Sequence, residues 1–134
     1  MSVEIKFRGL TSGSGIWVYG DLIQLDSDTL IVGKDMSAGQ FINGHIELRA
    51  ISVYPESLRQ FTGLKDKNGV EIYEGDIVVW KVNDIVRAAP VYFDELQASF
   101  WMGKDKDSGH LVLNDWMRGE HEVIGNIHQN PELL

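Results

Sequence analysis

Four carboxylates stand close together in the middle of the chain: Asp66, Glu71, Glu74 and Asp76. Hard divalent cations bind several oxygen ligands, and two neighbouring carboxylates can divide the roles of general acid and general base. The pattern of a calcium-binding loop, with oxygen ligands at alternate positions and Gly at the sixth, is absent. Asp66 and Asp76 stand in turn sequences, where Asp is common. We therefore expect no metal site and no catalytic residue in this segment.

Four histidines are candidates for metal ligands or general bases: His45, His110, His121 and His128. No two of them have the close spacing of known zinc motifs, and the chain contains no cysteine. Single histidines on strands are more often packing or surface residues than zinc ligands. The expectation is that the chain binds no metal and no cofactor.

The segment Gly13-Ser14-Gly15 is similar to a phosphate-binding loop only in its glycines. A P-loop ends in Gly-Lys-Ser/Thr, whereas here a strand-like segment follows, Ile16 to Tyr19. We expect a hairpin loop. No serine stands in a Gly-x-Ser-x-Gly elbow. An enzyme stays an alternative, because catalytic triads are defined by geometry rather than by sequence position.

Composition favours a small folded protein that carries an acidic charge. The chain has 134 residues, 43% of them hydrophobic, and a net charge of −8. Residues 1–60 carry 5 basic and 7 acidic side chains, and residues 61–134 carry 7 basic and 13 acidic, so the halves have charges of −2 and −6. Such a field repels phosphate backbones. We therefore expect no nucleic-acid binding.

Other features of the sequence bear on where the protein works. No apolar stretch approaches the roughly 20 residues of a membrane span. The first residues, Met1 to Lys6, have neither the basic region nor the apolar region of a signal peptide. The absence of cysteine suits a reducing compartment. We expect a soluble cytoplasmic protein, with no membrane association.

The strand pattern predicts a mainly β protein with one or two short helices, since no apolar period of 3.6 residues persists. Apolar and polar residues alternate from Val3 to Arg8, which predicts a strand with Val3, Ile5 and Phe7 facing inward. The other predicted strands are residues 16–25, 29–32, 41–54, 77–87, 90–93, 98–102, 111–113 and 121–127. Residues 26–28, 33–40, 104–109 and 114–119 are expected to be turns or loops.

Two further turns divide the C-terminal half. Asn68-Gly69 predicts a tight hairpin turn with Gly69 at positive φ, and Asn83-Asp84 allows a second hairpin. Pro55-Glu56 can open a short helical turn, because Pro is favoured at the first helical position. We place the boundary between two subdomains there, at 1–55 and 56–134.

Three segments in chain order are similar to the motifs of one family. They are Ile5–Leu10 followed by Trp17–Ile23, then Phe61–Asp66 leading into Ile72–Val78, and last Glu122–His128 followed by Asn130–Leu134. Together they resemble YopX-like proteins, which bacteriophages and prophages encode. The resemblance implies a mostly β fold with an SH3-like roll in residues 56–134. It carries over no activity and no catalytic residue, and residues 24–54 and 83–119 match none of its motifs.

Aromatic residues are the remaining candidates for a binding surface. In an SH3-like roll, exposed aromatic side chains can form a groove for an extended peptide. Most of them are expected to fill the core, Trp80 among them. Trp101 and Trp116 stand next to predicted loops. Together with Tyr92, they are our candidates for an interaction surface.

The leading hypothesis is a non-enzymatic protein-interaction module of a phage or prophage, with a protein partner. The first alternative is a nucleic-acid-associated accessory protein, or an acidic DNA mimic. The second is an enzyme of unknown chemistry. A free strand edge between Ile77 and Val86, and possibly the terminal Leu133-Leu134, also predict a homo-oligomer.

Overall fold

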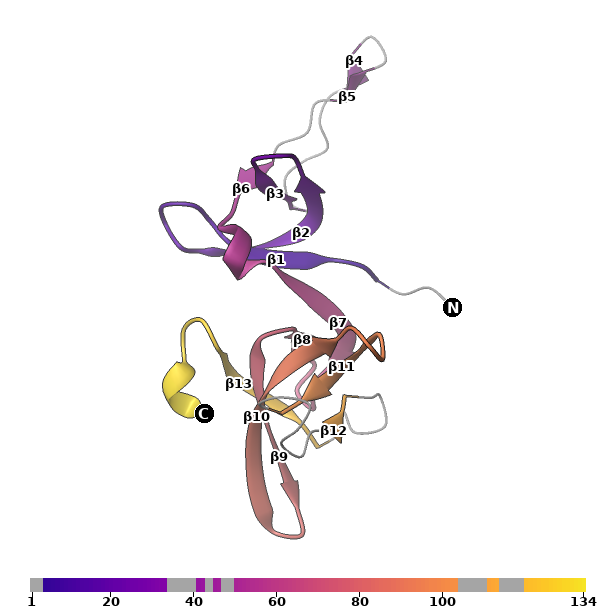
Figure 1. Ribbon diagram of the computed structural model, residues 1–134, viewed down its shortest axis with the longest axis vertical. Coiled ribbons are helices and arrows are strands. Elements are labelled where there is room, and N and C mark those ends of the chain that lie inside the picture. Colours follow the sequence, from indigo (N-terminus) through magenta and orange to yellow (C-terminus); the bar gives the residue numbers. More distant parts are fainter. Residues whose placement is uncertain (1–3, 34–40, 43–44, 47–49, 104–110, 114–119) are drawn as a thin grey trace. The chain divides into compact units, whose positions relative to one another are not determined.

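The computed structural model describes residues 4–33, 41–42, 45–46, 50–103, 111–113 and 120–134. Antiparallel strands make up most of this part of the chain, and the helices described in it are two single 3-10 turns, η1 (Pro55–Ser57) and η3 (Pro131–Leu133). The predicted mainly β fold is confirmed, as is the short helical turn after Tyr54. The chain divides into two compact units, Met1–Gln60 and Phe61–Leu134 (Figure 1).

The N-terminal unit is built on an antiparallel sheet in the order β6-β3-β2-β1. The strands described in this unit are β1 (Phe7–Leu10), β2 (Trp17–Gln24), β3 (Thr29–Val32), β4 (Phe41–Ile42), β5 (His45–Ile46) and β6 (Ile51–Ser52). Strands β4 and β5 pair with each other in a separate two-stranded sheet. The long strand β2 changes partner midway, because Gly20 pairs with β1 whereas Asp21 pairs with β3. At this point the backbones come close together. A Cβ atom on Gly20 would lie 2.0 Å from the carbonyl oxygen of Val32.

The first predicted strand is wrong in its start and in its inward face. Strand β1 begins at Phe7, Ile5 is 63% exposed, and Arg8 is buried. The reason lies in the partner strand. Beyond Gly20, which faces Phe7, β2 pairs with β3 instead of β1. On the other side of β1, the described pairing with β7 covers only Phe7 and Arg8. The strand pairing described for β1 therefore stops before residues 4–6, and sheet register does not determine which of their side chains face inward.

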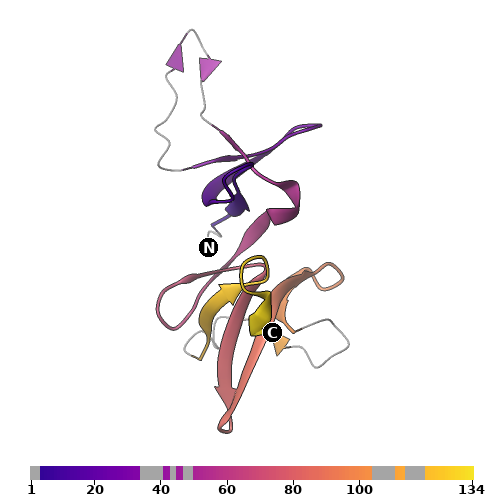
Figure 2. The same cartoon turned by 90° about the vertical axis from the view of Figure 1, so that its left-hand side faces the viewer.

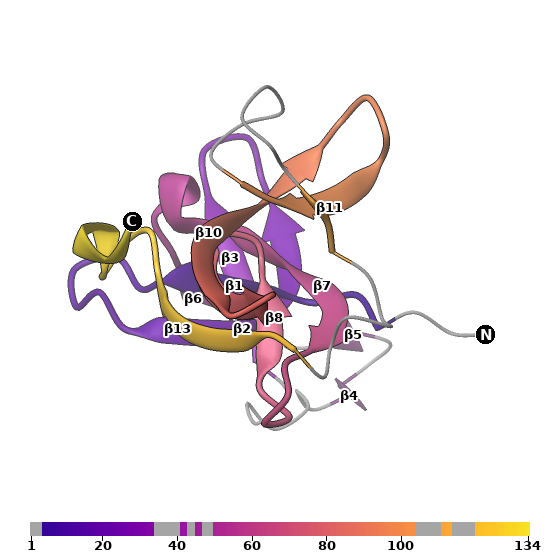
Figure 3. The same cartoon turned by 90° about the horizontal axis from the view of Figure 1, so that it is seen from below.

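The C-terminal unit contains a five-stranded antiparallel sheet in the order β12-β11-β10-β9-β13. Its strands and those of the preceding hairpin are β7 (Arg59–Lys65), β8 (Glu71–Tyr73), β9 (Asp76–Val82), β10 (Ile85–Asp94), β11 (Ser99–Met102), β12 (Leu111–Val112) and β13 (Glu122–Asn126). Strand β7 starts in the N-terminal unit, where Arg59 and Gln60 pair with β1. Figure 3 shows β13 and β11 on opposite sides of the β9–β10 hairpin.

One face of this sheet forms the core of the unit. Val78 and Trp80 of β9, Ala89 and Val91 of β10, and Met102 of β11 pack together there. They join Ile72 of β8 and Leu113 in one buried cluster. Trp80 is 6% exposed, so its predicted place in the core is confirmed.

Both predicted tight turns of the C-terminal unit are confirmed. Gly69 has a φ of 80°, in the β7–β8 hairpin. Asn83 and Asp84 have φ values of 50° and 65°, and they connect β9 directly to β10. Positive φ at both central residues defines a type I′ turn, whose twist matches that of a two-stranded ribbon. The strand over Thr29–Val32 also has its predicted bounds.

The C-terminal segment folds back on the end of β13. The side-chain oxygen of Asn126 accepts hydrogen bonds from the backbone N–H groups of His128 and Gln129, at 3.1 and 2.9 Å. Helix η3 follows, and Leu133 and Leu134 are both exposed. The terminal leucines are therefore not docked on a core within the chain.

Candidate functional site

The face of the five-stranded sheet opposite to the core carries a row of apolar side chains. Cross-strand neighbours in an antiparallel sheet, and residues two apart on one strand, point to the same face. Tyr92 lies opposite Trp101, and Ala88 lies opposite Val79. With Val86 and Pro90 on the same side of β10, these residues form what we call the outer face: Val79, Val86, Ala88, Pro90, Tyr92 and Trp101.

Exposure on the outer face increases toward the tip of the β9–β10 hairpin. Tyr92, Trp101 and Pro90 are half-buried, Ala88 is exposed, and Val86 is 69% exposed. Ile77 points to the same side opposite Pro90 but is fully buried, so the face is covered near the start of β9. The accessible apolar surface therefore follows β10 from Pro90 to the hairpin tip, with the two aromatic rings at its other end.

The two aromatic residues of the outer face are held by neighbouring strands. The indole N–H of Trp101 donates a hydrogen bond of 2.9 Å to the hydroxyl oxygen of Ser99, two residues earlier on the same face. A buried indole or phenol commonly keeps a polar partner while its ring stays available for contact. The structure thus brings together two of the three predicted surface residues, Tyr92 and Trp101. Trp116 lies outside the described residues.

The opposite side of the same two strands carries a second aromatic pair. Phe93 and Phe100 face each other across β10 and β11, with ring centroids 5.2 Å apart in an edge-to-face arrangement. Phe100 packs against the core cluster, and Phe93 is exposed at the end of the sheet. Because Phe93 is adjacent to Tyr92 but on the other face, it provides an internal control for the outer face.

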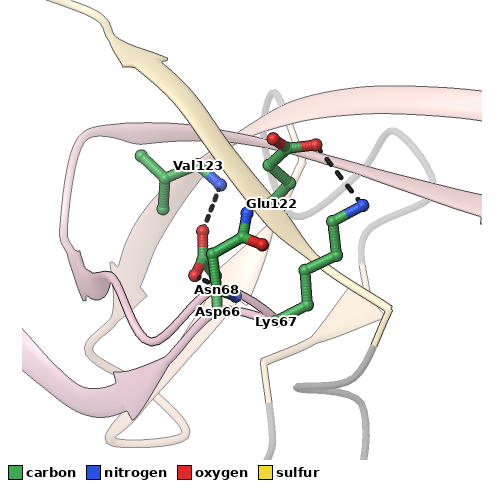
Figure 4. Close-up of polar contacts among 5 residues, drawn as sticks. All are labelled: Asp66, Lys67, Asn68, Glu122 and Val123. Carbon is green, nitrogen blue, oxygen red and sulfur yellow. Dashed lines mark hydrogen bonds and ion pairs between the residues drawn. The ribbon is translucent and has the colours of Figure 1, made fainter.

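The carboxylate segment is a structural connection. Asp66 is 4% exposed. Its carboxylate accepts backbone hydrogen bonds from Asn68 and Val70 within its own turn, at 2.8 and 2.9 Å, and from Val123 of β13 at 2.9 Å (Figure 4). Lys67 adds an ion pair to Glu122, at 3.4 Å. The carboxylate thus joins the β7–β8 turn to the edge strand of the sheet.

Asp76 has a similar role at the next turn. It is buried, and its carboxylate accepts a hydrogen bond of 2.7 Å from the backbone N–H of Tyr73. Glu71 lies half-buried on β8, next to the core residue Ile72. In the part of the chain that the structure describes, no group of three or more His, Asp or Glu residues is placed to hold a metal ion.

The histidines and serines lie in separate places. His121 is fully buried, with its ring centroid 5.6 Å from that of Trp80, and its backbone carbonyl accepts a hydrogen bond from Lys67. His128 is half-buried near η3. His110 and the side chain of His45 lie outside what is described. Ser14 belongs to the β1–β2 loop, where its hydroxyl contacts that of Thr11.

One feature of the surface was missed in the sequence. From Asn83 to Ala88 every residue is exposed, and these include two β-branched apolar residues, Ile85 at 57% and Val86. Figures 1 and 2 show the hairpin extending away from the rest of its unit. The alternating pattern of β10 could not reveal this exposure, because it depends on how far the neighbouring strands β11 and β13 accompany the hairpin. Among the described residues, no helix is long and apolar enough to cross a membrane.

Comparison with known proteins agrees with the mainly β fold. The sequence model of the YopX protein family matches residues 6–134, so the chain belongs to the YopX family. The chain is also similar to a solved structure, the crystal structure of protein EF1440 from Enterococcus faecalis. The identity is 28% and the TM-score 0.65, with 99% of each chain covered. The comparison with curated proteins gave no match.

Proposed function

We propose that this protein is a non-enzymatic interaction module, encoded by a phage or prophage and acting in the host cytoplasm, that binds a protein partner through the outer face. The observation that carries the proposal is the row of apolar residues from Val86 to the Tyr92–Trp101 pair on one side of the sheet. Aromatic residues at the end of an apolar surface are typical anchors of protein interfaces.

Charge indicates the kind of partner. The C-terminal half carries −6, so a partner with basic residues around an apolar centre is favoured over an acidic one. The described carboxylates support the same choice of function. Asp66 and Asp76 accept hydrogen bonds from backbone N–H groups, and this structural role supports the proposal of an interaction module.

The test compares two substitutions on adjacent strands. A partner is first captured from host cells with the wild-type protein, identified, purified and titrated by calorimetry. Trp101→Ala should weaken its binding at least about tenfold, because truncating an aromatic anchor commonly costs about 2 kcal/mol or more. Phe93→Ala, on the opposite face of the same strand pair, should leave the affinity within about twofold. Equal effects of the two variants would contradict the outer face as the binding surface.

The nucleic-acid alternative has its own outcome in this experiment. In one outcome, nuclease treatment releases the captured partner, and the partner binds Trp101→Ala and Phe93→Ala as tightly as it binds the wild type. These two results together would favour an accessory protein of nucleic-acid complexes. A DNA mimic would compete with duplex DNA for the captured partner, and Trp101→Ala would then have little effect.

A further inference from the structure

In the part of the chain that the structure describes, the β10 side of the β9–β10 hairpin has an open backbone edge near the tip. Among the described residues, β10 pairs with β11 only from Val91 to Asp94, whereas its pairing with β9 extends to the tip, at Ile85. Residues 85–90 therefore have β9 on one side and no described strand on the other. An unpaired edge of this kind can accept a further strand.

The turn determines which backbone groups point outward. In a two-residue hairpin the flanking residues, here Val82 and Ile85, form a hydrogen-bonded pair, and such pairs alternate with non-hydrogen-bonded ones. Val86 and Ala88 then stand in non-hydrogen-bonded pairs, and their N–H and C=O groups point away from β9. Pro90 follows the same alternation. Its carbonyl accepts a hydrogen bond of 3.1 Å from Gly103, on the side of β11.

This open edge is short and has two defined ends. The tight turn at Asp84 closes one end. Pro90 closes the other, since it has no N–H to donate and its carbonyl is already used by Gly103. A strand that is added here must therefore end after about three residues, or it would meet Gly103 at the end of β11. The tip of the same hairpin in a second molecule meets this requirement, because its β10 strand stops at the tight turn a few residues away.

We propose that the protein forms a twofold-symmetric dimer by antiparallel pairing of the β10 edges of two copies. Val86 of each copy lies opposite Ala88 of the other, so that the open N–H and C=O groups of both residues are all paired. The turn of the second copy then reaches Pro90, where the open edge stops. The exposed side chains of Val86 and Ala88 from both copies lie together on one face, which covers apolar surface.

Charge affects the stability of this dimer. Arg87 stands at the centre of the pairing, opposite Arg87 of the second copy, and like charges directly opposite each other weaken a strand pair. The contact is also small compared with a standard interface of about 1,600 Å². The dimer is therefore weak, and it becomes tighter with added salt, which screens the two guanidinium groups.

The experiment measures mass against concentration by sedimentation velocity. Ala88→Pro removes one outward N–H without removing a bond to β9, and the chain already carries proline two residues later in the same orientation. Dimerisation should weaken at least about tenfold, whereas Ala88→Ser, which keeps the N–H, should match the wild type. A wild-type chain that stays monomeric up to about 1 mM, or a proline variant that dimerises like the wild type, would overturn the proposal.

A second variant protects the test if the proline variant does not fold. Arg87 is exposed, and Arg87→Thr should tighten the dimer about threefold and reduce its strengthening by salt, since only the repulsion between the two acidic copies is then left to screen. Weaker or unchanged dimerisation would show that the register is wrong. The dimer shares Val86 and Ala88 with the outer face, but it does not need the Tyr92–Trp101 pair. Trp101→Ala should dimerise normally, and Arg87→Thr should bind the captured partner normally, so the two proposals fail separately.

Discussion

At the scale of single residues, Asp66 shows how a polar side chain can hold a β fold together. One carboxylate oxygen accepts two N–H groups of its own turn, and the other accepts the N–H of Val123, far away in the sequence. Bonds from backbone N–H groups to an ionised carboxylate are about twice as strong as neutral ones. The residue is buried, and three backbone donors satisfy its carboxylate.

Replacing Asp66 by Ala should lower the free energy of unfolding by about 2–4 kcal/mol, since three backbone N–H groups lose the acceptor of their partly buried hydrogen bonds. Lys67→Ala is the matched control in the same turn. It removes only the solvent-exposed ion pair with Glu122 and should cost less than about 1 kcal/mol. Chemical denaturation of both variants measures the difference. Similar losses would mean that the ion pair, rather than the carboxylate, connects the turn to β13.

At the scale of elements, the β9–β10 hairpin differs from the other strand pairs of its unit. Its base belongs to the core, through Val78, Trp80, Ala89 and Val91. Its tip is stabilised by the type I′ turn and by an exposed ion pair between Lys81 and Asp84, at 3.5 Å. The turn sequence therefore largely determines how often the tip opens.

Asp84→Gly should make the hairpin tip more stable, by about 0.5–1 kcal/mol. Asp84 has a φ of 65°, and glycine adopts this region without strain, so that Asn-Gly is the preferred type I′ pair. Asp84→Ala should have the opposite sign, because alanine disfavours positive φ. Both variants lose the same ion pair, which cancels in the comparison. Amide hydrogen exchange of Ile85 and Val86 measures opening. Equal exchange in the two variants would contradict the turn assignment.

At the scale of the whole molecule, the excess of acidic residues sets the long-range field. The net charge is −8, and −6 of it belongs to residues 61–134. Among the described ion pairs, Lys67 and Lys81 each contact a carboxylate, which leaves less basic surface for phosphate groups. A protein partner with basic residues is attracted by the same field.

We predict no specific binding of duplex DNA at about 150 mM salt, where binding through a few lysines is weaker than micromolar. Fluorescence anisotropy with a labelled duplex, measured over a range of salt concentrations, checks this. Charge-reversing Glu122→Lys removes the partner of Lys67 and should raise the weak affinity at low salt, which serves as a positive control. Submicromolar binding of the wild-type protein at 150 mM salt would contradict the prediction and favour the accessory-protein alternative.

Features that depend on a few neighbouring residues could be predicted from the sequence alone. The hairpin turn at Asn68-Gly69, the turn at Asn83-Asp84, the strand over Thr29–Val32 and the helical turn at Pro55 all have the predicted place. Each depends on local preferences, such as the ease with which Gly and Asn adopt positive φ or the fixed φ of Pro. The buried position of Trp80 could also be predicted locally, because Trp80 follows three apolar residues in a strand-forming segment.

The pairing of distant strands was decided only by the tertiary structure. The alternation from Val3 to Arg8 predicts a strand, but β1 pairs with β2 and β7 only from Phe7 onward, and Ile5 is exposed. Tyr92 and Trp101 could be proposed separately, yet only the register of β10 and β11 places them opposite each other. The open edge at Val86 exists because β11 ends beside Val91. Strand register depends on contacts between residues far apart in the chain, which local preferences do not encode.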